Sequence, residues 1–141
     1  MPTIQFFEED ITYKLKNKTA VRKWITEAIV AEGFKLAELT YVFCSDEYLL
    51  QINQQYLNHD TYTDIITFDN SDENSTIAGD IFISIERIKE NAAKFTVTEA
   101  QELHRVIIHG ALHLLGYKDK SVADKKKMTL KEDYYLSKRS F

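Results

Sequence analysis

The chain is poor in the residues that cross-link or interrupt a fold: its 141 residues include one cysteine, one proline and four glycines. The lone Cys44 excludes a disulfide within the chain, and so little proline and glycine excludes a low-complexity or collagen-like chain. No apolar run approaches the roughly 20 residues of a membrane span. The first residues lack the basic segment and apolar run of a signal peptide. We therefore expect a cytoplasmic protein that does not enter a membrane.

Hydrophobic residues make up 44% of the chain. A chain of this length can bury about two-thirds of its unfolded surface, so we predict one domain over residues 1–141. The net charge of −4 argues against a general nucleic-acid coat protein. The stretch from Lys118 to Phe141 nevertheless has eight basic and four acidic residues, and is locally +4. This basic end would attract a polyanion, although exposed helices often carry such lysines.

The hydrophobic periodicity predicts alternating strands and helices. Strands are expected at residues 3–7, 35–44, 65–68 and 77–85, with a hairpin or longer loop at 69–76. Helices are expected at residues 19–32, 84–94 and 122–137. Two more helices are expected from their capping residues: one begins after Ser45 and Asp46, and the other begins at the capping box formed by Thr98 and Gln101. This order predicts an α+β fold, in which a small mixed β-sheet is packed by helices.

The most informative stretch runs from His109 to Asp119 and reads H-G-A-L-H-L-L-G-Y-K-D. Helical residues four apart project about 40° apart and about 6 Å along the axis, so His109 and His113 share one face. Gly116 stands where a left-handed residue ends a helix, which would let Asp119 turn back toward both imidazoles. We predict that these three side chains bind one divalent metal, best matched by zinc, in a metal-dependent hydrolase. The alternative is two core histidines and an unrelated surface aspartate.

The same spacing is similar to the metzincin signature H-E-x-x-H-x-x-G-x-x-H, so the helix is expected to be zincin-like. Gly110 replaces the glutamate that acts as general base in those proteases, and Asp119 replaces the third histidine. The first change argues against peptide hydrolysis. His104 lies about 140° around the helix from His109, and is expected to be a packed core histidine. The helix is apolar nearly all round from Val106 to Leu115, which indicates burial.

Three ordered motifs carry a family resemblance. The family signature H-G-x-L-H-L-x-G-Y-D-H matches residues 109–119, and L-N-x-x-Y-R-x-x-D-x-x-T-D-V-L-S-F is similar to I-N-Q-Q-Y-L-N-H-D-T-Y-T-D-I-I-T-F at 52–68. The third, G-D-I-x-I-S, matches residues 79–84. Over about residues 45–132 the chain resembles the YbeY-type endoribonucleases, the bacterial ribosomal-RNA maturation factors with a single metal site.

The resemblance implies an α+β fold, a bound divalent metal, cleavage of single-stranded RNA, and work on ribosomal RNA with the small ribosomal subunit. Two positions depart from the family pattern. Asp119 stands where the third histidine ligand usually is, with Lys118 in place of the aspartate before it. Leu57 stands where the family places an arginine, and leucine cannot grip a phosphate through paired hydrogen bonds as arginine does.

These residues support one leading mechanism and two alternatives. In the leading one, Asp64 is the candidate general base, and Lys118 and Lys120 hold RNA phosphates beside the metal. Leu57 favours instead a non-catalytic ribosome assembly factor with a structural metal. The third interpretation is a zincin-type metalloprotease, against which Gly110 counts.

Overall fold

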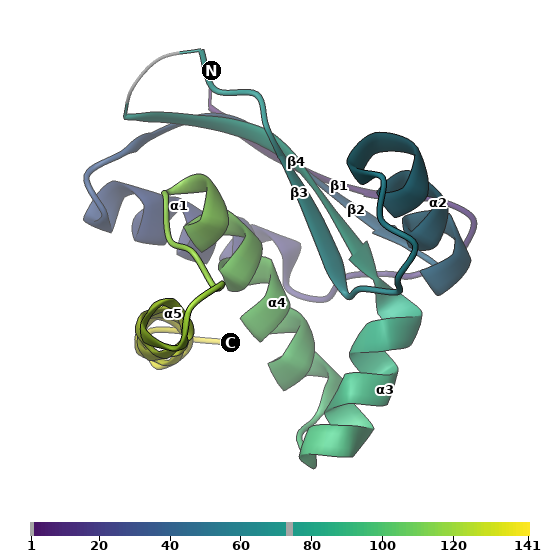
Figure 1. Ribbon diagram of the computed structural model, residues 1–141. Coiled ribbons are helices and arrows are strands. Elements are labelled where there is room, and N and C mark those ends of the chain that lie inside the picture. Colours follow the sequence, from purple (N-terminus) through teal and green to yellow (C-terminus); the bar gives the residue numbers. More distant parts are fainter. Residues whose placement is uncertain (1, 73–74) are drawn as a thin grey trace.

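In the computed structural model, which describes residues 2–72 and 75–141, strands and helices follow one another in the expected order (Figure 1). The elements are β1 (Thr3–Glu8), α1 (Lys18–Ala31), β2 (Lys35–Cys44), α2 (Asp46–Leu57), β3 (Ile65–Asp69), β4 (Thr76–Ser84), α3 (Ile85–Phe95), α4 (Glu99–Leu114) and α5 (Val122–Leu136). Their bounds agree with the predicted ones to within one or two residues. Residues 73–74 of the predicted loop lie outside the described residues.

The strands form one sheet in the order β1-β2-β4-β3. β1 pairs with β2 and β2 pairs with β4 in parallel, whereas β3 pairs with β4 antiparallel. The sheet is therefore mixed, which confirms the predicted α+β class. The antiparallel pair places Ile65 opposite Ile83, so that the start of β3 lies beside the end of β4.

The main core lies between α1 and α4 on one side and the inner face of the sheet on the other (Figure 1). Alternate strand residues point into it, including Leu39, Tyr41, Ile81 and Ile83, all fully buried. The Tyr41 hydroxyl donates a 2.9 Å hydrogen bond to the carbonyl of Ile107. Because this bond joins β2 to the middle of α4, it ties the predicted metal helix to the sheet.

α2 packs on the opposite face of the sheet (Figure 1). Its Leu49 and Ile52 meet Cys44 and Ile66 in a second, smaller cluster of buried residues. The buried Cys44 thiol has a pKa raised to about 12, first by burial and then by nearby acidic groups. It is thus a small core residue, with no nucleophilic character at neutral pH.

Caps define both ends of α4. The Thr98 side chain accepts a hydrogen bond from the Gln101 backbone while the Gln101 side chain accepts one from the Thr98 backbone, which confirms the predicted capping box. At the other end Gly116 has φ +103°, as expected. The Tyr117 N–H bonds the Leu112 carbonyl there, in the Schellman pattern. The chain therefore reverses immediately after the second histidine.

α4 approaches the sheet closely at Gly110. A Cβ atom at that position would lie 2.8 Å from Cδ1 of Ile65 and 3.0 Å from Cγ2 of Ile81. Any side chain at this position, including the glutamate of the metzincin signature, would force Ile65 or Ile81 to shift. The likeness of α4 to the zincin helix is therefore limited to the spacing of its two histidines. Among the described residues, no helix has the length and apolar character needed to cross a membrane.

Candidate metal centre

The structure brings the three predicted ligands together. Asp119 Oδ2 lies 3.4 Å from Nε2 of His109 and 3.4 Å from Nε2 of His113. The two imidazole rings project from neighbouring turns of α4, with their centroids 4.5 Å apart. One candidate ligand atom from each residue lies within 4.8 Å of the others. The reversal at Gly116 therefore does what the spacing predicts, and returns a carboxylate to the face that carries both histidines.

Hydrogen bonds on the far side of each ring leave both Nε2 atoms free to bind a cation. His109 Nδ1 lies 2.5 Å from Oε2 of Glu132, and His113 Nδ1 lies 3.0 Å from the Tyr117 carbonyl. A carbonyl and a carboxylate only accept hydrogen bonds, so Nδ1 carries the proton in each neutral ring. The Nε2 lone pairs then face Asp119, which is the arrangement found for histidines that bind metals.

The residues fit a tetrahedral ion. Ligand atoms about 2.0–2.1 Å from a tetrahedral zinc lie about 3.3 Å from each other, close to the 3.4 Å separations of the carboxylate oxygen from both nitrogens. The donor set of two imidazoles and one carboxylate suits zinc, and three protein ligands leave a fourth position open. A divalent ion held by these three residues would be able to polarise a substrate at the open position.

The two histidines have opposite pKa shifts. Burial disfavours the charged form of His109, but the hydrogen bond and charge of Glu132, helped by Asp119 and Asp64, outweigh it and raise the pKa of His109. The pKa of His113 is lowered by burial and by the nearby His109. Of the two, His113 is thus more readily available as a neutral ligand.

A cleft of about 360 Å³ opens over the three ligands. One wall is the start of β3 together with Asp64, which directly precedes it, and the other is formed by α4 and the buried side of α5. The Asp64 carbonyl accepts a 3.0 Å hydrogen bond from the Ser84 backbone, which fixes this residue at the cleft edge. Burial raises the pKa of the Asp64 carboxyl, although the charge of His109 opposes the shift. The structure thus brings the predicted base into the same cleft as the ligands.

Sequence reasoning missed three charged residues of this cleft, Glu102, Arg105 and Glu132. Glu132 is 6% exposed, and its second oxygen pairs with Nη1 of Arg105 at 2.7 Å. Nη2 of Arg105 in turn lies 2.6 Å from Asp133. A signal for Glu132 exists in the sequence: it lies four residues after Met128 and three before Tyr135, on the buried stripe of α5. A charged residue on such a stripe needs a buried partner.

Other predicted residues lie elsewhere. Lys118 and Lys120 flank Asp119 and are exposed, but neither lines the described part of the cleft. Leu57 is 41% exposed at the end of α2 and also lies outside that lining. His104 is 7% exposed and packs edge-on against Trp24 and Phe141, as expected for a core histidine.

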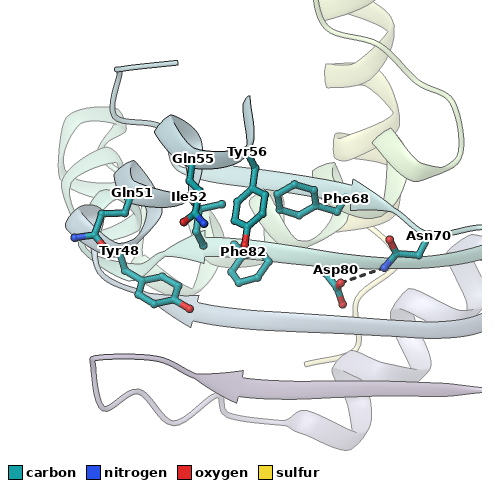
Figure 2. A pocket seen from close by; sticks show the side chains of 9 residues that line it. All are labelled: Tyr48, Gln51, Ile52, Gln55, Tyr56, Phe68, Asn70, Asp80 and Phe82. Carbon is teal, nitrogen blue, oxygen red and sulfur yellow. Dashed lines mark hydrogen bonds between the residues drawn. The ribbon is translucent and has the colours of Figure 1, made fainter. Parts of the chain in front are cut away.

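A separate pocket of about 460 Å³ lies between α2 and the outer face of the sheet. Figure 2 shows its aromatic side chains, Tyr48, Tyr56, Phe68 and Phe82, with Asn70 donating to Asp80 at one end (3.1 Å). None of the predicted site residues lines it. The chemistry predicted from the sequence therefore belongs to the inner-face cleft.

Fold and site together define a small mixed α/β protein in which two histidines and one carboxylate converge in an open cleft and could hold a metal ion. The family model of Endoribonuclease YbeY matches residues 3–140, and the chain belongs to this family. It is 53% identical to Endoribonuclease YbeY of Cytophaga hutchinsonii over 139 residues, which cover 99% of this chain and 97% of that protein. The Flavobacterium psychrophilum protein of the same name is 52% identical, with 92% of each chain covered.

The fold has a counterpart of known structure. The solution structure of a Thermotoga maritima protein superposes with a TM-score of 0.66 at 27% sequence identity. The match covers 96% of this chain and 87% of the other. The arrangement of the elements is therefore shared well beyond the close relatives.

Proposed function

We propose that the protein is a metal-dependent, single-strand-specific endoribonuclease that matures ribosomal RNA in the cytoplasm and takes part in assembly of the small ribosomal subunit. One observation carries the proposal: in a chain of the Endoribonuclease YbeY family, two histidines with free Nε2 atoms and one carboxylate converge in an open cleft. Zinc is the ion that this donor set suits best.

When bound, a divalent ion would supply Lewis-acid stabilisation of the charge that develops on a phosphodiester. The chain's own residues do the rest. Glu132 and the Tyr117 carbonyl orient His109 and His113. Asp64 accepts the proton of the attacking water, and burial, which raises its pKa, makes it a stronger base. Lys118 and Lys120 attract the phosphates on either side of the scissile bond.

Gly110 argues against the metalloprotease, whereas Leu57 favours the non-catalytic assembly factor. A metalloprotease would need a general base where Gly110 packs against Ile65 and Ile81, and a side chain there would have to displace these two residues. A non-catalytic assembly factor with a structural metal is favoured by one feature, Leu57, because no guanidinium stands at the position of the family's arginine.

Cleavage of ribosomal RNA by zinc-loaded protein tests the proposal. The parent should cut the RNA at discrete positions, and His113→Ala purified in the same way should not. His59→Ala, which changes an exposed histidine outside the site, should cut like the parent. Equal cleavage by parent and His113→Ala would point to a contaminating nuclease. No cleavage by the parent, together with retained binding to the small subunit, would favour the assembly factor.

The two lysines have their own test. Lys118→Gln with Lys120→Gln should weaken RNA binding and flatten its salt dependence, because fewer counterions are released. Lys89→Gln, at an exposed site on α3, is the control. A salt slope equal to that of the parent would remove Lys118 and Lys120 from the RNA interface.

A further inference from the structure

A second hollow of about 540 Å³ adjoins the metal cleft. It lies where the end of α3, the start of α4 and the end of α5 meet, and it shares Glu102 and Arg105 with the cleft. The two spaces are therefore neighbours on one surface. A polymer whose scissile phosphate sits at the metal ligands would have its next residue at this hollow.

One wall of the hollow is apolar and uncovered. Phe95 is 57% exposed and Val97 is 40% exposed, and both line it. Phe95 is the last residue of α3, and Val97 follows it in the turn to α4, in which Thr96 has a left-handed backbone (φ 58°). The turn holds the Phe95 ring at the surface instead of in the core. An exposed aromatic ring beside a basic group is a platform on which a nucleobase stacks.

The opposite wall carries two arginines. Arg105 is held by Glu132 and Asp133 but stays 36% exposed on its side chain. Arg139 donates from Nε to the Leu136 carbonyl (3.0 Å), and its Nη1 lies 2.7 Å from Nδ1 of His104. Both guanidinium groups are thus fixed before any ligand arrives. Burial, and then the charge of Arg105, lower the pKa of Arg139.

Two carboxylates also line the hollow. Asp133 is paired with Arg105, and Glu102 is 6% exposed at the border with the cleft. A carboxylate accepts hydrogen bonds from the amino groups of bases, and does not bind phosphate. Because Arg105 is already paired with carboxylates, the wall offers the guanidinium of Arg139 to a phosphate and Glu102 as an acceptor for a base.

We propose that this hollow binds one nucleotide of single-stranded RNA, the neighbour of the nucleotide at the metal cleft. Its base stacks on Phe95 and its phosphate lies at Arg139. The proposal rests on the endoribonuclease function proposed above.

Binding of a hydrolysis-resistant, phosphorothioate-linked single-stranded RNA of about eight nucleotides to the zinc-loaded protein tests this site. Phe95→Ala and Arg139→Gln should each raise the dissociation constant about tenfold. Tyr56→Ala, an exposed aromatic on the other face of the sheet (64% exposed), and Lys89→Gln should leave it unchanged. Thermal unfolding of each variant checks that the fold is intact. In cleavage assays Phe95→Ala should raise KM and leave kcat near the parent value.

An abasic scan locates the stacked base. In the parent, removal of one particular base should weaken binding about as much as Phe95→Ala does, and the same removal should have no further effect in Phe95→Ala. Parent-like binding by Phe95→Ala and Arg139→Gln, or an unchanged abasic effect in Phe95→Ala, would overturn the nucleotide site while leaving the endoribonuclease standing. A parent that neither binds nor cuts single-stranded RNA would overturn both.

Discussion

Nδ1 of His113 lies 3.0 Å from the carbonyl oxygen of Tyr117, so the turn that ends α4 orients a candidate metal ligand of the same helix. The Tyr117 hydroxyl in turn donates to Glu32 at 2.6 Å, at the end of α1. Tyr135 and Lys131 of α5 also donate to Glu32. These bonds outweigh the effect of burial and lower the pKa of Glu32, which keeps it ionised. One carboxylate thus anchors the turn that leads to Asp119.

Loss of this anchor should weaken metal binding. Tyr117→Phe and Glu32→Gln free the turn between Gly116 and Asp119, so we expect the zinc dissociation constant to rise about tenfold in each, by analogy with other groups that orient ligands. Competition with a chromogenic chelator measures it. Tyr62→Phe is the matched control, because its hydroxyl donates to Glu47 at 3.4 Å on the surface. The idea fails if all three variants bind zinc like the parent.

Glu132 should matter more than its neighbour Asp133, although both pair with Arg105. Glu132→Gln replaces the charged acceptor of the His109 N–H by a neutral one, and should weaken zinc binding about 10- to 100-fold. Asp133→Asn keeps the contact between Glu132 and His109, and should change zinc affinity little. Isothermal titration with zinc separates the two outcomes. Similar losses in both variants would show that Glu132 acts through Arg105 and not through the ligand.

Gly110 should tolerate no side chain. An exposed Gly→Ala change in a helix normally stabilises by about 0.5–1 kcal/mol. At Gly110 the added methyl would lie 2.8 Å from Ile65 and 3.0 Å from Ile81, so we expect Gly110→Ala to destabilise by about 1–3 kcal/mol. Urea unfolding gives the value, and Ala93→Gly, at an exposed position of α3, calibrates helix propensity. A gain in stability from Gly110→Ala would contradict the close approach of α4 to the sheet.

His104 should make the fold sensitive to acid. Burial and then the charge of Arg139 lower the pKa of His104 to about 4, from an ordinary value of 6.5. Below pH 6.5 the unfolded chain takes up a proton that the folded chain refuses until about pH 4. The free energy of unfolding should therefore fall across this window, by up to about 3 kcal/mol from this group.

A pair of variants separates His104 from the carboxyl groups that titrate in the same range. His104→Gln should show a shallower loss of stability between pH 6.5 and 4 than the parent, whatever its stability at pH 7. His59→Gln, at an exposed histidine, should follow the parent curve in chemical denaturation. Parallel curves for the parent and His104→Gln would rule out the linkage.

The local features of this protein could be predicted from the sequence. Element positions follow from hydrophobic periodicity, and the ends of α4 follow from the Thr98–Gln101 capping box and Gly116. The three candidate metal ligands lie within eleven consecutive residues. One helix and one turn are enough to place them, so their convergence needed no knowledge of the rest of the chain.

Only the tertiary structure decided which residues, distant in the sequence, contact the candidate metal ligands and the turn beside them. Glu132 reaches His109 from 23 positions away, and Glu32 reaches Tyr117 from 85 positions away. These contacts depend on how α1, α4 and α5 pack, and periodicity identifies the buried face of a helix but not its partner. The same packing makes Gly110 a requirement of close approach and puts Arg105 between the metal cleft and the adjoining hollow. Sequence thus determined the ligands through local geometry, while packing chose the residues that orient them.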